Sequence, residues 1–297
     1  MIESIKIDGF RGIRKSEKPI HLSDFTLLIG RNNSGKTSVL EALYGVFSGR
    51  DAITNQHRSP LIRNLHSNKS LSYRYSGEGT IQIEKENQTF DRPVQDNISE
   101  HTGIGNTDDV LYYPPSFKSL DNIYEGLQKK REEIEKKGSH VKVAELMNQH
   151  INDEYTEIYL ETLEMRKNPP DSQQFYVDIK DLGDGILRAI PVYLMIEAVE
   201  PELFLWDDIT TSLHPGLTRG LIEWLAERDT QFVGATHSID LLSALIDIQP
   251  DTDVSVIQLS KSADDVLSHT ELDLEELELM MENAGHDPRF MSDEFDL

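Results

Sequence analysis

The segment "LLIGRNNSGKTSVLEAL", residues 27–43, constrains the fold of this chain more than any other stretch. An apolar run breaks into a polar loop flanked by glycines, and the loop leads into a helical pattern. The loop matches G-x-x-x-x-G-K-[ST], in which the glycines let the backbone wrap closely around a phosphate group. A strand that feeds such a loop and then a helix aims backbone N–H groups at the phosphate. We therefore expect an α/β fold that binds a nucleotide.

Each fixed position of the loop has a chemical reason. The Lys36 ammonium is expected to reach the β- and γ-phosphates, and the Thr37 hydroxyl to ligate Mg²⁺. Successive N–H groups and the start of the following helix add positive potential. The residues expected to bind the nucleotide in this segment are Gly30, Arg31, Asn32, Asn33, Ser34, Gly35, Lys36, Thr37 and Ser38.

Two later apolar strands end in side chains suited to phosphate chemistry. "ELFLWDD" ends in Asp207, which suits Mg²⁺, and Asp208, which suits orienting or deprotonating an attacking water. "TQFVGATHS" ends near His237, and a histidine at the carboxyl edge of a parallel sheet can contact a γ-phosphate. Taken alone, the first segment could as well be a strand that ends in an acidic turn, and a single histidine at such a position is more often structural. Their order along the chain predicts one site, with Lys36, Asp208 and His237 as catalytic residues and Thr37 and Asp207 as metal ligands.

A second glycine-rich helix start lies in "DLGDGILRAIPVYLMIE". Gly183, Asp184 and Gly185 open an apolar helix, whose first N–H groups would face a phosphate. Because the first loop already serves the nucleotide of this chain, we expect the second helix start to bind the nucleotide of a partner chain. The alternative is a glycine turn before an ordinary core helix.

Composition excludes several classes of function. The formal charge is −24, from 53 acidic and 29 basic residues, so the surface repels nucleic acid and DNA binding is not supported. The absence of cysteine excludes a disulfide framework, a thiolate zinc site and a cysteine nucleophile. The longest apolar run, residues 189–196, contains Pro191 and is too short to span a bilayer. We expect a soluble, cytoplasmic protein with no membrane partner.

The ordered set "FRGI", "LLIGRNNSGKTSVLEAL", "LGDGILRAI", "LFLWDDITTSLHP" and "ATHS" resembles the ABC-class ATPases of the SMC, RecF and OLD kind. The resemblance is closest to stand-alone OLD-like or AAA-type ATP-binding proteins, and it covers residues 1–47 and about 175–245. It implies a Walker A motif at Gly30 to Thr37, a signature at Gly183 to Gly185, Walker B at Leu203 to Asp207, a D-loop at Ser212 to Pro215 and a switch at His237. It also implies ATP and Mg²⁺ sandwiched between two copies of the chain.

The sequence departs from the family pattern at two acidic positions. Asp208 stands where these ATPases usually have glutamate, and the shorter side chain predicts slow hydrolysis, since a misplacement of about 1 Å costs on the order of 100-fold. Asp184 stands where the signature usually has serine. The end of the strand "YYPPS" is the nearest candidate for the Q-loop.

The predicted fold is an ABC-type P-loop head with a mainly parallel central sheet, N-terminal antiparallel strands and a helical insertion. We expect four segments: 1–116 with Walker A, 117–172 as the insertion, 173–260 with signature, Walker B and switch histidine, and 261–297 as an acidic tail with a terminal helix. Strands are expected at 71–75, 80–85 and 89–90, and "DVLYYPPS" (109–116) is expected to be one more strand, ended by prolines. "QQFYVDI" is expected to be a strand of the α/β alternation.

The insertion and the tail have simple physical interpretations. "KKREEIEKK" pairs Lys129 with Glu133 and Glu132 with Lys136 at i,i+4 spacing, which favours a self-paired solvated helix over a DNA contact. The helical face of the tail, formed by Leu274, Leu277, Met280 and Met281, is expected to pack on the domain; the alternative is that it recruits a partner.

The leading functional hypothesis is an ATPase that dimerises on ATP and gates a separate effector, such as a nuclease in DNA repair or phage defence. The length beyond His237 leaves no room for the Toprim domain of OLD nucleases, so we expect the effector on another chain. The alternative is a nucleotide-responsive scaffold that binds ATP with negligible hydrolysis. A small-molecule kinase or GTPase is disfavoured, because the sequence has no [NT]-K-x-D motif and neither class needs the Gly183 and His237 elements.

Overall fold

The computed structural model describes residues 1–47, 50–55, 62, 71–76, 78–94, 110–115, 117–151, 153–169, 173–209, 213–283 and 288–289. Within these ranges, eleven strands form one sheet in the order β6-β5-β1-β2-β14-β13-β4-β12-β11-β7, with β3 beside β1. The strands are β1 (Ile2–Phe10), β2 (Ile13–Ser16), β3 (Ile20–His21), β4 (Phe25–Ile29), β5 (Thr80–Lys85), β6 (Gln88–Pro93), β7 (Val110–Tyr113), β11 (Leu203–Trp206), β12 (Gln231–Ala235), β13 (Val254–Lys261) and β14 (Val266–Leu272).

The central strands run parallel, in the order β13-β4-β12-β11-β7. Strands β11 and β7 consist of apolar and aromatic residues that are buried along their whole length, as expected for parallel strands covered on both faces. In β4, Phe25, Leu27 and Ile29 belong to one hydrophobic core, whereas Leu28 faces a second core on the other side. The sheet therefore separates two cores, and its strand ends are the places where polar side chains can gather.

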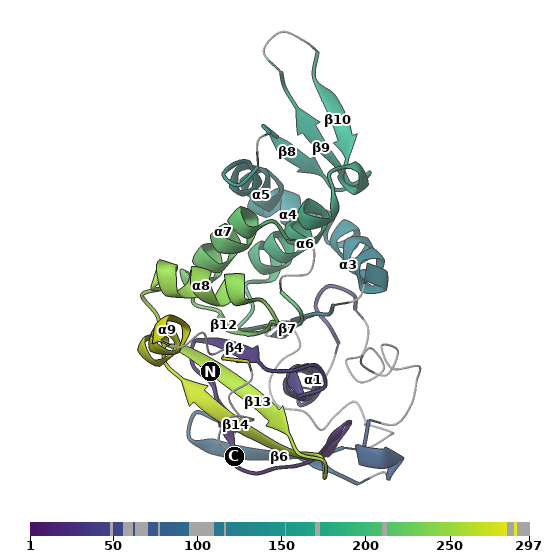
Figure 1. The fold of residues 1–297 in the computed structure, drawn as a ribbon. Coiled ribbons are helices and arrows are strands. Elements are labelled where there is room, and N and C mark those ends of the chain that lie inside the picture. The colour runs from purple at the N-terminus through teal and green to yellow at the C-terminus, as the bar shows by residue number, and fades with distance from the viewer. Residues whose placement is uncertain are drawn as a thin grey trace.

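Helices cover both faces of the parallel strands. The helix α1 (Lys36–Gly45) packs Val39, Leu40 and Leu43 into the second core. On the opposite face lie α6 (Asp184–Val199), α7 (Pro215–Ala226) and α8 (Ile239–Ile248), as Figure 1 shows. The N-terminal strands pair antiparallel, β1 with β2, β3 and β5, and β5 with β6. The predicted fold class is confirmed.

The insertion begins with three helices, α3 (Phe117–Lys129), α4 (Arg131–Lys137) and α5 (Ser139–Asn148). After α5 the predicted helix is wrong, because the chain forms β8 (Glu157–Tyr159) and β9 (Glu164–Lys167) instead. Ile158 and Met165 are paired across these strands and buried in the core, so this segment follows a strand pattern. Figure 1 shows this small sheet at the end of the molecule far from β1 and β6.

Other expectations need correction as well. The strand within "QQFYVDI" is β10 (Phe175–Asp178), which pairs with β9 in the small sheet rather than with the central sheet. A 3₁₀ helix (Tyr73–Tyr75) with a positive φ at Arg74 replaces the strand expected at 71–75, and a second one (Ile179–Asp181) precedes α6. The sequence analysis also did not anticipate β14, which lies in the acidic C-terminal segment and pairs antiparallel with β13.

The ion pairs in this charged helical segment differ from the two that were expected. The helix breaks between Lys129 and Arg131, and the ion pairs join Lys130 to Glu133 at 3.3 Å and Arg131 to Glu135 at 3.7 Å. The tail prediction is confirmed for α9 (Leu274–Asn283), because Leu277 is buried and the other three apolar side chains pack against the first core. Across the described residues, no helix combines the length and apolar character that a membrane span requires.

Candidate nucleotide site

The phosphate loop connects β4 to α1 and requires glycine at its first position. Gly30 has a φ of 133°, and a Cβ at this position would lie 2.3 Å from the Leu259 carbonyl oxygen of β13. Gly35 has a φ of 107° and caps the start of α1. Because L side chains rarely adopt such angles, both glycines are needed to turn the strand into the helix.

Lys36 is held inside this loop. Its Nζ donates hydrogen bonds of 2.9 Å to the carbonyl oxygens of Gly30 and Arg31, and lies 3.4 Å from the Ser34 hydroxyl. Burial lowers the pKa of Lys36 to about 8, and the nearby Asp207 and Asp208 carboxylates oppose this shift. The ammonium is therefore mainly charged at pH 7, and it is fixed beside the strand ends.

A cavity of about 460 Å³ opens over the loop, within the size range of small-molecule sites. It brings together most of the residues that the sequence predicts for one site, although they come from distant parts of the chain. Its lining residues are Arg11, Asn32, Asn33, Ser34, Gly35, Lys36, Thr37, Ser38, Pro115, Asp207, Asp208, Ala235 and His237. Gly30 and Arg31 are not among them and contribute through the carbonyl oxygens that hold Lys36.

Asp207 and Thr37 lie together and have the chemistry of a magnesium site. Asp207 follows β11 and is only 4% exposed, and its side chain is hydrogen-bonded to Thr37. Burial raises the pKa of Asp207 to about 6; the Thr37 hydrogen bond opposes this, and the charges of Glu41 and Asp208 add to it. Its Oδ2 atom is buried and has no hydrogen-bond partner among the described residues. A hard cation would satisfy that oxygen, so the pair fits Mg²⁺.

Asp208 and His237 complete the polar edge of the cavity. Asp208 has a φ of 57°, which marks a sharp turn directly after β11, and the next residue, Ile209, donates its N–H to the Ala235 carbonyl at 3.0 Å. This bond ties the end of β11 to the end of β12, just before His237. Burial and the charge of Lys36 lower the pKa of His237, so its imidazole is neutral at pH 7.

Arg11 is a cation in the lining of the cavity that was not expected from the sequence. Arg11, the arginine of "FRGI", sits in a turn with a φ of 49° and pairs with the buried Glu41 of α1. Arg11 also lines the cavity, so it adds positive charge opposite the acidic strand ends. The sequence signal that could have indicated Arg11 is its position in a short turn directly after a strand. Pro115, from the region expected to hold the Q-loop, lies in the same lining.

The signature residues are not part of this cavity. Gly183 and Asp184 are exposed, and a Cβ at Gly183 would meet no atom within 4 Å. The helix α6 begins at Asp184, and no side chain caps its first N–H groups. Of the expected D-loop, Ser212 lies outside the described residues, while His214 caps α7 by accepting the Gly216 N–H at 3.2 Å.

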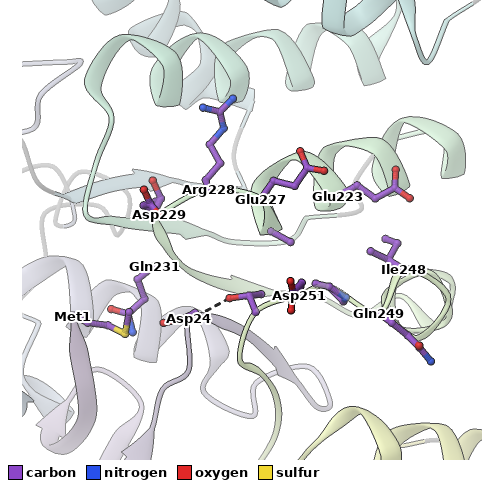
Figure 2. Close-up of a pocket in the computed structure, with 14 residues that line it drawn as sticks. Met1, Asp24, Glu223, Glu227, Arg228, Asp229, Gln231, Ile248, Gln249 and Asp251 are labelled. Atoms are coloured by element: carbon purple, nitrogen blue, oxygen red, sulfur yellow. Dashed lines mark hydrogen bonds between the residues drawn. The ribbon is translucent and has the colours of Figure 1, made fainter.

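A larger cavity, of about 720 Å³, lies at the opposite, amino-terminal edge of the parallel strands (Figure 2). Five carboxylates line it: Asp24, Glu223, Glu227, Asp229 and Asp251. Its arginine, Arg228, is already paired with Glu197 at 2.5 Å and lies over the Trp224 ring at 4.0 Å. Because carboxylates dominate its lining, this cavity disfavours a triphosphate, and the smaller cavity is the candidate site for a nucleotide.

Two family profiles match the parts of the chain that form the smaller cavity. A profile described as "AAA domain, putative AbiEii toxin, Type IV TA system" matches residues 85–243, more than half of the chain. The chain belongs to this AAA-domain family. A second profile, described as "AAA ATPase domain", matches residues 1–97, which include the phosphate loop. The two matches together span the residues that line the smaller cavity.

Solved structures show where the fold belongs. An SMC head bound to the C-winged helix domain of ScpA matches with a TM-score of 0.60 and 15% identity, over 92% of this chain and 98% of that one. An SMC head with an extended coiled coil from Pyrococcus furiosus matches with a TM-score of 0.55 and 13% identity, over 95% of this chain and 98% of that one. The SMC head of Thermotoga maritima matches with a TM-score of 0.51 and 15% identity, over 92% of this chain and 99% of that one. The fold is that of an ABC-class ATPase head of the SMC type.

One curated relative, the uncharacterized protein MJECL10 of Methanocaldococcus jannaschii, is 35% identical over 97 residues. The match covers 30% of this chain and 44% of the relative, so it spans less than half of that protein.

Proposed function

We propose that this AAA-domain protein binds and hydrolyses ATP with Mg²⁺, and that two copies close around the nucleotide to gate a separate effector. The observation that carries the proposal is the single cavity over the phosphate loop that gathers Lys36, Thr37, Asp207, Asp208 and His237. These side chains supply the charges and proton acceptors that phosphoryl transfer to water requires.

In this proposal each residue of the cavity has a defined task. The loop N–H groups and Lys36 hold the β- and γ-phosphates, while Thr37 and Asp207 hold Mg²⁺, which neutralises charge on the phosphate oxygens. Asp208 orients or deprotonates the attacking water. His237 is neutral at pH 7 and can donate one hydrogen bond to the γ-phosphate.

The dimer is supported by the signature helix start. Gly183 and Asp184 are exposed, and they lie outside the lining of the cavity in their own chain. A second copy can bring the N-terminus of its α6 to a phosphate, provided that the Asp184 carboxylate turns aside. The ATP site is then complete only when two chains meet.

The effector is supported by the structural neighbours. SMC heads of this fold have been solved bound to domains of ScpA, so a head of this shape can carry a second protein. We infer that the effector of this protein is such a separate partner, with a nuclease in DNA repair or phage defence as the leading candidate.

Size-exclusion chromatography with light scattering tests the dimer. Asp208→Asn should bind ATP and Mg²⁺ without hydrolysing it and elute as a dimer, whereas the same variant without nucleotide should be a monomer. Lys36→Ala is the matched control and should stay monomeric in both conditions. A monomeric Asp208→Asn protein saturated with ATP would count heavily against the proposal.

The alternative function is a scaffold that binds ATP with negligible hydrolysis, because the short side chain of Asp208 predicts slow hydrolysis. Phosphate release by the wild type, measured beside Lys36→Ala, separates the two functions. Release well above the Lys36→Ala baseline supports an ATPase, and equal release from both proteins supports a scaffold that only binds ATP.

A further inference from the structure

A side chain from the C-terminal segment reaches the nucleotide site. Arg289 Nη1 donates a hydrogen bond of 2.6 Å to the carbonyl oxygen of His237, a residue 52 positions earlier in the chain. Arg289 is the only lysine or arginine after Asp264, in a stretch that is otherwise strongly acidic. The one cation of this segment therefore contacts the backbone of the residue expected to meet the γ-phosphate.

The backbone around His237 is fixed on both sides. Thr236 is fully buried, and its N–H continues the sheet ladder to the Leu28 carbonyl at 3.0 Å. Ser238 donates its N–H to the Thr236 hydroxyl at 3.0 Å, and its own hydroxyl caps α8 at the Leu241 N–H. Between these two anchors, the His237 carbonyl is held by Arg289. Because side-chain direction is coupled to the backbone, this bond helps to keep the imidazole of His237 in the lining of the cavity.

The bond is of a strong kind. A guanidinium that donates to an oxygen forms a charge-assisted hydrogen bond, which is shorter and about twice as strong as a neutral one. The charged groups that act on the imidazole are Lys36, Asp208 and Arg289. Lys36 and Arg289 disfavour the imidazolium and Asp208 favours it, so Arg289 affects both the place and the protonation of the imidazole.

We propose that Arg289 is a positioning residue for hydrolysis, which holds His237 in the geometry for the γ-phosphate and makes turnover depend on the C-terminal segment. This inference rests on the proposed function, because it assigns a task to His237 in the reaction. Arg289 does not line the cavity. Its effect should therefore fall on the chemical step rather than on the binding of ATP.

Steady-state hydrolysis by Arg289→Gln and Arg289→Lys in the full chain tests the proposal. Arg289→Gln should lower kcat by about tenfold or more, because a displaced imidazole loses its transition-state contact, while KM for ATP changes by less than about twofold. Arg289→Lys should recover part of the loss, since it restores the charge but not the planar fork. Arg219→Gln is the matched control: Arg219 is exposed, pairs with Glu223 at 3.0 Å, and should behave as wild type.

A second readout does not need turnover. NMR titration of the His237 ring in the nucleotide-free protein should show a higher pKa in Arg289→Gln than in wild type, because a nearby cation has been removed. Arg219→Gln should leave this pKa unchanged.

The outcomes separate the two proposals. Unchanged kcat in Arg289→Gln beside an active wild type, or a rise in KM alone, overturns the role of Arg289 and leaves the ATPase standing. Wild-type turnover no higher than that of Lys36→Ala sinks the proposed hydrolysis. In that case the titration decides on the contact, and an unmoved His237 pKa would overturn it.

Discussion

Asp207 is a carboxylate that the fold buries close to two other carboxylates, Glu41 and Asp208. Its raised pKa means that the ionised form costs free energy in the nucleotide-free protein, which is the form that Mg²⁺ requires. The residue is thus placed for a ligand rather than for the stability of the fold. The Thr37 hydroxyl, which is hydrogen-bonded to the same side chain, lowers this cost only in part.

We predict that Asp207→Asn stabilises the nucleotide-free protein while it abolishes tight binding of ATP with Mg²⁺. At pH 7 to 8 the carboxylate is ionised both in the folded state, with a pKa of about 6, and in the unfolded state, and only the folded state bears the cost. The free energy of unfolding should rise by about 3 kcal/mol in the variant. Denaturant unfolding with EDTA present measures this gain.

The stability difference at Asp207 depends on pH. As the pH falls through 6, the folded wild type takes up a proton at Asp207 before the unfolded chain does, so the cost disappears. The difference between Asp207→Asn and wild type should therefore be present above pH 6 and vanish by about pH 4. A variant that is less stable than wild type at pH 8 would contradict this account of the site.

At the scale of elements, α3 joins the insertion to the N-terminal part of the chain through one glycine. A Cβ at Gly126 would lie 2.4 Å from the carbonyl oxygen and 2.8 Å from the carbonyl carbon of Ile53. These are backbone atoms, which cannot swing aside as the end of a side chain can. The close approach of α3 to this segment therefore depends on the missing side chain.

Gly126→Ala should destabilise the protein by about 2 kcal/mol, although alanine is the better helix former by about 1 kcal/mol. Gly216→Ala is the matched control, because its Cβ would come no closer than 3.5 Å to the His214 ring and the substitution should be neutral or slightly stabilising. Thermal unfolding of both variants beside wild type decides the matter. Equal melting temperatures for the two variants would show that the contact at Ile53 is not tight.

The elements that the sequence predicted well are those with strong local patterns. The loop from β4 to α1 and the strand ends at Asp207 and His237 were located because apolar strands end in polar residues at the same edge of a parallel sheet. The segment after α5 was predicted as helix because it is rich in charged residues. Its two short strands β8 and β9 have one fully buried residue each, Ile158 and Met165, which is too few to give a clear strand pattern. β14 was missed because the polar residues Ser268 to Glu271 interrupt its apolar pattern.

Contacts between distant segments could not be predicted. Arg11 reaches the cavity through the pairing of β1 and β2, and the contact of Arg289 with His237 depends on where the C-terminal segment returns. Neither follows from periodicity or from spacing along the chain. Only the folded arrangement brings these two arginines to the nucleotide site.

At the scale of the whole molecule, the phosphate loop and the signature helix start lie on one chain but do not share a cavity. A site assembled from two copies explains why Gly183 and Asp184 are exposed. The formal charge of −24 opposes the approach of two copies, so free association should be weak. The bound nucleotide would then supply the contacts that close the dimer, which makes assembly depend on ATP.

A mixing experiment tests whether each ATP site uses the loop of one copy and the signature of the other. Lys36→Ala removes the loop, and Asp184→Trp blocks the signature with an exposed bulky side chain; each variant alone should be inactive. Lys36→Ala does not dimerise with itself, but in a mixed dimer one of the two sites keeps both intact parts. An equal mixture should therefore regain phosphate release well above that of either variant alone, up to about half of the wild-type level. A mixture as inactive as either variant alone would contradict the composite site.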